Sequence, residues 1–145
     1  MPPAPPATLI DPFDTTITYK TMAQLISDAL ANGGLTGPNA SGVGKALTKQ
    51  FAAVQASMGA KQYAAALGQL TAFVDLVKAQ CCSPSAGKAL TTPTAITLQL
   101  DAMLVYHSAL CLGSGQLSVK QQQQSYSYYS GIVSSLGGKV LPPCP

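Results

Sequence analysis

The stretch TPTAITLQLDAMLVYHSALCL, residues 92–112, decides the fold. Thr92 and Pro93 are typical of a helix N-cap and first turn, and apolar side chains then recur at helical spacing on two faces. One face carries Ile96, Leu100, Met103, Leu104, His107 and Cys111, and the other carries Leu98, Val105 and Leu112. Because a helix that is apolar on two faces is buried on both, we predict that this helix lies at the centre of a helical bundle.

Four more segments show apolar residues at three- and four-residue spacing, which predicts four more helices. The expected ranges are about 21–32, 43–58, 63–80 and 118–136. Capping boxes mark the first and last of these starts, and glycine pairs mark their ends. The signals are Thr21 with Gln24, Ser118 with Gln121, Gly33-Gly34 and Gly137-Gly138. The sequence therefore predicts an all-α fold, a five-helix bundle.

The two ends of the chain do not show helical periodicity. Prolines favour an extended N-terminal arm over residues 1–20, and the β-branched run at 15–19 predicts a short strand-like segment. The prolines of the arm are Pro2, Pro3, Pro5 and Pro6. We expect a helical domain over 21–137 and an extended C-terminal tail over 138–145 that is tied down by a disulfide at Cys144.

The chain is poor in charge. Charged residues make up 9% of its 145 residues, against about 25% in an average domain. All eight basic residues are Lys, all five acidic residues are Asp, and the net charge is +3. This composition predicts no nucleic-acid partner, because no basic cluster and no Arg are present. A surface with little self-repulsion favours association with further copies, so we predict a homo-oligomer or filament.

The four cysteines are Cys81, Cys82, Cys111 and Cys144. An even number predicts two disulfides and an extracellular location, although Cys81, Cys82, His107 and Cys111 could instead form a zinc site. We predict that Cys81 or Cys82 bonds to Cys111 and that the other bonds to Cys144. Because a disulfide needs Cα atoms within about 7 Å, this pairing requires a fourth helix that crosses back along the third or is strongly tilted against it.

No motif predicts catalysis, a resident metal or a cofactor. His107 is the only histidine, and without a nucleophile and an orienting carboxylate nearby we interpret it as a half-buried packing residue. The sequence Gly42-Val43-Gly44-Lys45 lacks the Gly and the Ser or Thr that complete a phosphate loop. The five Asp residues are scattered. No run of residues reads as a membrane span, since glycine, His107 and glutamine interrupt the longest uncharged stretch.

Two polar features are candidates for contact with a partner. Asn39 begins the glycosylation motif Asn39-Ala40-Ser41, although helix N-capping is the commoner role of an Asn at a helix start. The run Gln121 to Gln124 is followed by three tyrosines. We expect Tyr128 to face the core and Tyr126 and Tyr129 to face outward as a contact surface, for protein or for sugar rings.

The stretch from Met22 to about Leu112 resembles the FIMAH type of small helical module found in secreted bacterial multidomain proteins. The resemblance rests on Ala66-Leu67, Leu70, Ala72-Phe73, Val77 and Ala79-Gln80, followed by Gly87-Lys88-Ala89-Leu90-Thr91. It implies a bacterial, exported, non-catalytic appendage. This chain differs from the family pattern in the insertion Cys81-Cys82-Ser83-Pro84-Ser85 and in its fifth helix.

These observations predict a non-catalytic extracellular protein, a fibre or surface-layer subunit that associates with itself through the N-terminal arm and the Tyr/Gln-rich helix. The alternative is an accessory module that attaches a secreted enzyme to polysaccharide or to the cell surface. Neither interpretation makes the chain an enzyme.

Overall fold

The computed structural model describes residues 9–11, 14–19, 22–81 and 89–143. Its described part contains five α-helices, as the sequence predicts, and the all-α bundle is confirmed. The helices are α1 (Met22–Asn32), α2 (Ala40–Gly59), α3 (Tyr63–Ala79), α4 (Thr92–Leu112) and α5 (Val119–Ser135). A single turn of 3-10 helix, η2 (Ser114–Gln116), joins α4 to α5.

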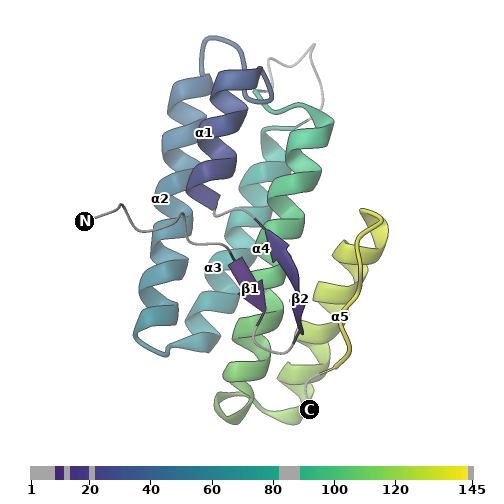
Figure 1. The fold of residues 1–145 in the computed structure, drawn as a ribbon. Coiled ribbons are helices and arrows are strands. Elements are labelled where there is room, and N and C mark those ends of the chain that lie inside the picture. The colour runs from purple at the N-terminus through teal and green to yellow at the C-terminus, as the bar shows by residue number, and fades with distance from the viewer. Residues whose placement is uncertain (1–8, 12–13, 20–21, 82–88, 144–145) are drawn as a thin grey trace, which may run out of the picture.

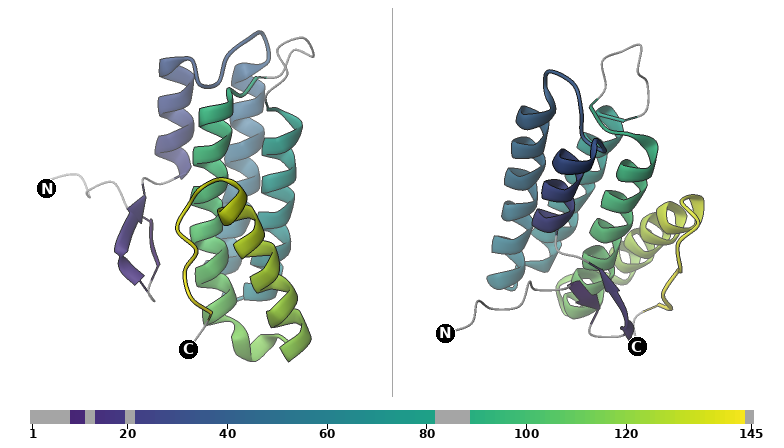
Figure 2. Two further views of the ribbon diagram at one scale, coloured as in Figure 1. Left: turned by 90° about the vertical axis from the view of Figure 1, so that its right-hand side faces the viewer. Right: turned by 45° about the horizontal axis from the view of Figure 1, so that its top comes forward.

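Helix α4 lies in the middle of the bundle (Figure 1). It contacts α3 over much of its length, and α1 and α5 pack against it as well. Helices α2 and α3 form an antiparallel hairpin beside it, whereas α5 lies on the side of α4 away from α2 (Figure 2). The residues of α4 that are fully or almost fully buried include Ala102, Met103, Leu104, Ala109 and Leu110. The prediction of a central fourth helix is therefore confirmed.

Helix α4 is also long and apolar enough to cross a membrane by length and composition alone. Within the bundle, 72% of the 18-residue apolar stretch of α4 is buried. A core helix with this degree of burial passes such a test because its apolar faces contact other helices.

Three backbone segments meet at the start of α4, around Leu35, Cys81 and Leu90. Leu90 is 3% exposed and forms isolated β-bridges with Leu35 and with Cys81. Its N–H donates to Gln80 O at 2.9 Å, and the next N–H, of Thr91, donates to Gly34 O at 3.0 Å. The start of α4 is thereby held at the end of the bundle where α3 stops. The N-cap is Thr91, whose side chain accepts from the N–H of Thr94, so the predicted cap at Thr92 was wrong by one residue.

Helices α3 and α4 consequently run antiparallel, and the predicted crossover of α4 was wrong. The far end of α4 returns to the start of α3, where Gly113 packs closely against Tyr63. Cys81 is therefore at one end of the pair and Cys111 at the other. The 21 residues of α4 separate these ends by roughly 30 Å at 1.5 Å per residue. The two cysteines are not at disulfide distance.

Gly113→Ala is expected to destabilise the protein by about 1–3 kcal/mol, in the range of overpacked sites. A Cβ at residue 113 would overlap Tyr63 Cβ and would lie 2.9 Å from the carbonyl oxygen of Ala109. Gly115→Ala, two residues away, is the control, because a Cβ there meets nothing within 4 Å. Urea unfolding of both variants checks this prediction, and equal stabilities would contradict it.

An N-terminal hairpin precedes the bundle. Strand β2 (Asp14–Tyr19) contains the predicted strand at 15–19, and it pairs antiparallel with β1 (Leu9–Asp11), which the sequence did not predict. In the register of the pair, Leu9 faces Tyr19 and Ile10 faces Thr18. The hairpin lies against α4. The four prolines of the predicted arm, Pro2, Pro3, Pro5 and Pro6, are outside the described residues.

Candidate interaction site

The segment 139–143, here called the C-terminal strap, turns back over α4 and α5. Helix α5 ends at Ser135, and Gly137 adopts a φ of +75°, which glycine reaches at no steric cost. A Cβ on the next residue, Gly138, would lie 2.7 Å from Leu100 and 3.0 Å from Val133. The two glycines thus allow both the reversal and the close approach that follows it. The strap then runs antiparallel to α5 (Figures 1 and 2).

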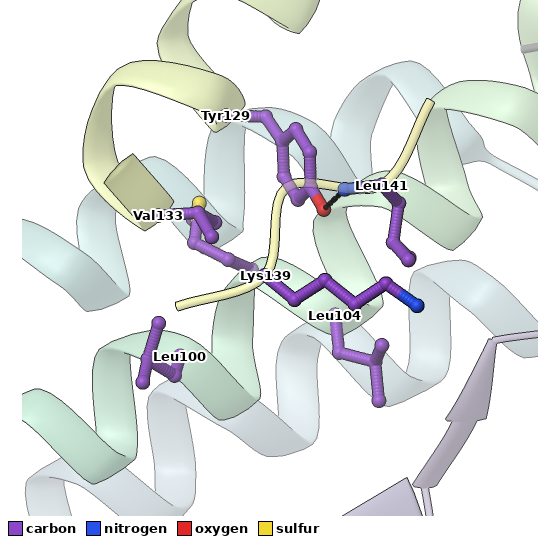
Figure 3. A pocket seen from close by; sticks show the side chains of 7 residues that line it. Leu100, Leu104, Tyr129, Val133, Lys139 and Leu141 are labelled. Carbon is purple, nitrogen blue, oxygen red and sulfur yellow. Dashed lines mark hydrogen bonds between the residues drawn. The ribbon is translucent and has the colours of Figure 1, made fainter. Parts of the chain in front are cut away.

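Leu141 is the anchor of the strap. Its side chain is 1% exposed and lines a small cavity between α4 and α5 (Figure 3). The other residues that line this cavity are Leu100, Met103, Leu104, Tyr129, Val133 and Lys139. The volume open to the centre of a water molecule is only about 10 Å³ there, which is near the lower limit for one water molecule. The strap therefore completes the core on this side of α4.

Two tyrosines hold the backbone of Leu141. Its N–H donates to Tyr129 Oη at 2.9 Å, shown in Figure 3, and its carbonyl oxygen accepts from Tyr126 Oη at 2.7 Å. Tyr129 is 2% exposed and Tyr126 is half-buried. The prediction that Tyr129 forms an outward contact surface was therefore wrong: this ring is core. Tyr128, predicted as core, is only half-buried.

His107 completes the attachment of the strap. Its Nε2 lies 2.9 Å from the carbonyl oxygen of Pro142 and, because a carbonyl can only accept, Nε2 is the donor. The ring is 1% exposed and packs against the ring of Tyr129 at a centroid distance of 5.1 Å. His107 thus has the hydrogen-bonded packing role predicted for it, with deeper burial than expected.

A groove of about 340 Å³ lies beside the strap. It is lined by Leu110, Gln122, Gln123, Tyr126, Ser127 and Pro143. Gln122 is committed to the fold, since its Nε2 donates to the carbonyl oxygens of Ser114 and Leu117 at 2.9 and 3.2 Å. Gln121 closes the predicted capping box with Ser118, which is confirmed. Gln121, Gln123 and Gln124 are exposed, so three of the four glutamines of the run face solvent.

Asp101 is a buried carboxyl in the middle of α4. It is 1% exposed, and within the described part of the chain neither carboxylate oxygen has a hydrogen-bond partner. Burial disfavours the charged form and raises the pKa of Asp101 to about 8. The sequence pattern did not predict a site at this residue, because α4 is apolar on two faces and has no polar stripe to which Asp101 could belong.

The remaining sequence candidates are dispersed. Among residues 9–11, 14–19, 22–81 and 89–143, no group of three His, Cys, Asp or Glu side chains could hold a metal ion. Cys82 and Cys144 lie outside the described residues. Gly42, Gly44 and Lys45 are part of the regular helix α2, so they form no phosphate loop.

Asn39 occupies the N-cap position of α2, as expected, but its side chain makes no capping hydrogen bond. It is exposed. The prediction of side-chain capping was therefore wrong, and the amide of the glycosylation motif faces solvent.

The sequence predicts that the C-terminal tail is extended, and it also contains a signal for the reversal that places this tail over α4 and α5. Val140 and Leu141 are apolar residues that follow a glycine pair after the single residue Lys139 and precede two prolines. Such a pattern is typical of a chain that reverses and then runs extended over an apolar surface. Comparison with known proteins adds no assignment: no family model, no curated protein and no solved structure matches this chain.

Proposed function

We propose that this chain is a non-catalytic extracellular assembly module that associates with copies of itself through the outer face of α5. This outer face comprises the exposed residues Lys120, Gln123, Gln124, Ser127, Gly131 and Ser134. The observation that carries the proposal is that this exposed face is almost uncharged and lies beside the groove. Apart from Lys120, helix α5 has no charged residue.

The side chains of the outer face favour contact with another protein surface. Ser127, Gly131 and Ser134 are small and lose little rotamer entropy when they are covered. At the start of the helix, Val119 is 69% exposed, so one apolar side chain lies four residues before Gln123 on the helix surface. Because the face carries a single charge, two copies can approach without the repulsion that keeps charged surfaces apart.

The groove offers a place for a protruding side chain of a neighbour. Its apolar lining comes from Leu110, Tyr126 and Pro143, and its polar rim comes from Gln123 and Ser127. An apolar centre with an uncharged polar rim is the usual composition of a protein interface. The four prolines of the N-terminal arm that were predicted to take part in self-association lie outside the described residues, so the proposal depends on α5 alone.

The extracellular part of the proposal depends on the cysteines and on the FIMAH resemblance. Neither described cysteine is a free thiol, and oxidised cysteines are typical of secreted proteins. The resemblance covers Ala89, Leu90 and Thr91, which form the junction at the start of α4. A module of this type acts by binding rather than by catalysis.

Gln123→Lys with Ser127→Lys is expected to weaken self-association at least tenfold, because two added positive charges on each copy would repel across a shared face. Analytical ultracentrifugation over a range of concentrations measures this. The control is Gln55→Lys, an exposed position on α2, because helix α2 lies on the side of α4 away from α5 (Figure 1). A wild-type protein that stays monomeric up to millimolar concentration would contradict the proposal.

One observation favours the alternative function of polysaccharide attachment. The ring of Tyr126 lines the groove beside the polar side chains of Gln123 and Ser127, and an aromatic ring with polar neighbours suits stacking against sugar. Monomeric protein retained on a polysaccharide column, with retention lost in Gln123→Lys, would favour this alternative.

A further inference from the structure

The strap contacts α4 at His107, one helical turn before Cys111. Residues 107 and 111 lie four apart on one face of the helix, and Cys111 Sγ is 3.7 Å from His107 Nε2. The same nitrogen donates to the carbonyl oxygen of Pro142 at 2.9 Å. The oxygen of Pro142 and the sulfur of Cys111 can therefore be no farther apart than the sum of these two distances.

Cys144 follows Pro142 by two residues. It lies outside the described residues, but the length of the chain limits where it can be: consecutive Cα atoms are about 3.8 Å apart, so two steps span at most about 7.6 Å. A disulfide needs Cα atoms within about 7 Å. We propose that Cys111 and Cys144 form an intramolecular disulfide that locks the C-terminal strap onto α4.

The other cysteines cannot compete for Cys111. Cys81 lies at the opposite end of the α3–α4 pair, where it bridges to Leu90, and Cys82 is the next residue. Four cysteines allow three pairings. Two of these join Cys111 to residue 81 or 82, which the antiparallel arrangement forbids. The pairing of Cys111 with Cys144 also agrees with the absence of a free thiol among the described cysteines.

Formation of the bond is an ordinary thiol–disulfide exchange. The thiolate of Cys111 or Cys144 attacks a disulfide-form oxidant and releases one thiol of the oxidant. The second protein thiolate then attacks the protein sulfur of the resulting mixed disulfide and releases the other thiol of the oxidant. The two protein thiols together lose two protons and two electrons. The oxidant accepts them and leaves as two thiols.

The bond gives the position of the strap a dependence on redox conditions. Pro143, next to Cys144, forms one wall of the groove beside Tyr126. While the disulfide is closed, this wall and the Leu141 anchor are held by a covalent bond in addition to the three hydrogen bonds from His107, Tyr126 and Tyr129. This inference does not require self-association, and its test is independent of that proposal.

Tryptic mapping without reduction tests the pairing. Cleavage after Lys78, Lys88, Lys120 and Lys139 places the cysteines in three peptides, 79–88, 89–120 and 140–145. The proposal predicts that 89–120 and 140–145 are recovered as one linked species and that 79–88 is linked to neither. Either rival pairing joins all three peptides in one species and would overturn the proposal. Separate peptides alkylated at Cys111 and Cys144 would also overturn it.

Two further measurements test the lock. On a non-reducing gel the protein is expected to migrate as a monomer, and a dimer linked through Cys111 and Cys144 would overturn the intramolecular assignment. Cys144→Ser is expected to lower Tm by roughly 10 °C, from the loop-closure effect of the bond. Cys82→Ser, the control, leaves the bond in place. An unchanged Tm in Cys144→Ser would overturn the claim that the bond locks the strap.

Discussion

Asp101→Asn is expected to stabilise the protein by several kcal/mol at about pH 9 and by much less at about pH 5. The substitution keeps the size of the side chain and removes the charge. Asp101 is 1% exposed, and no hydrogen bond within the described residues satisfies its carboxylate oxygens. Leaving a charge in such a position is costly, because the interior cannot replace the water that solvates it.

The direction of the pH effect follows from the pKa of Asp101, which burial raises from 3.8 to about 8. Between these two values the folded protein keeps the proton and the unfolded chain has lost it. The folded state then binds more protons, so the free energy of unfolding falls as pH rises. The fall is about 1.4 kcal/mol for each pH unit. Above about pH 8 both states are ionised and the loss is complete.

Urea unfolding at about pH 5 and about pH 9 measures the effect in both proteins. Wild-type stability should fall steeply between these values, and Asp101→Asn should flatten the dependence. Asp75→Asn is the matched control, since it makes the same chemical change at an exposed position on α3, where substitutions change stability by about 0.5 kcal/mol or less. An equal gain from Asp101→Asn at both pH values would show that the carboxyl is not protonated in the folded state.

Tyr129→Ala is expected to destabilise the protein by about 3–5 kcal/mol, the usual cost of removing a large aromatic side chain from a core. Tyr129 is among the largest fully buried side chains. Its ring packs against His107 at 5.1 Å and against Tyr126 at 5.8 Å between centroids. Its hydroxyl accepts from the N–H of Leu141. One substitution therefore removes core packing and an attachment point of the strap together.

Tyr129→Phe separates these two contributions. It keeps the ring and removes the hydroxyl, so we expect a loss of about 1–2 kcal/mol from the unpaired N–H of Leu141. Tyr126→Phe is the matched variant, because it removes the hydrogen bond to the carbonyl of the same residue. Amide exchange at Leu141 should accelerate in Tyr129→Phe. If Tyr129→Phe cost as much as Tyr129→Ala, the hydroxyl rather than the ring would dominate.

The helices could be predicted from the sequence because their signals are local. Periodic apolar residues, the Ser118–Gln121 capping box and the glycine pairs act within a few residues of one another, and each of the five helices was located to within about three residues. The cap at Thr91 was missed by one residue because Thr91 and Thr92 both have the hydroxyl that an N-cap needs. Pro93 is compatible with a cap at either residue, because proline is well tolerated in the first turn of a helix.

The inward face of α5 could not be predicted in the same way. Tyr128 and Tyr129 are neighbours and point about 100° apart on a helix, and the rest of α5 carries few apolar residues to decide between them. Burial of Tyr129 depends on the strap, which arrives from twelve residues later to donate to its hydroxyl. This is a tertiary contact with no local signature.

The sequence by itself determined the number of helices, the central place of α4 and the low charge of the surface, because periodicity and composition act locally. Only the tertiary structure decided the direction of α4, since the loop after Cys81 was long enough for either direction and the contacts of Leu90 with Leu35 and Cys81 selected one. That choice set Cys81 and Cys111 at opposite ends. It also left α4 buried on nearly every side. Within residues 92–112, which decide the fold, Asp101 therefore lies in the core, and His107 and Cys111 lie on the face of α4 that the strap covers.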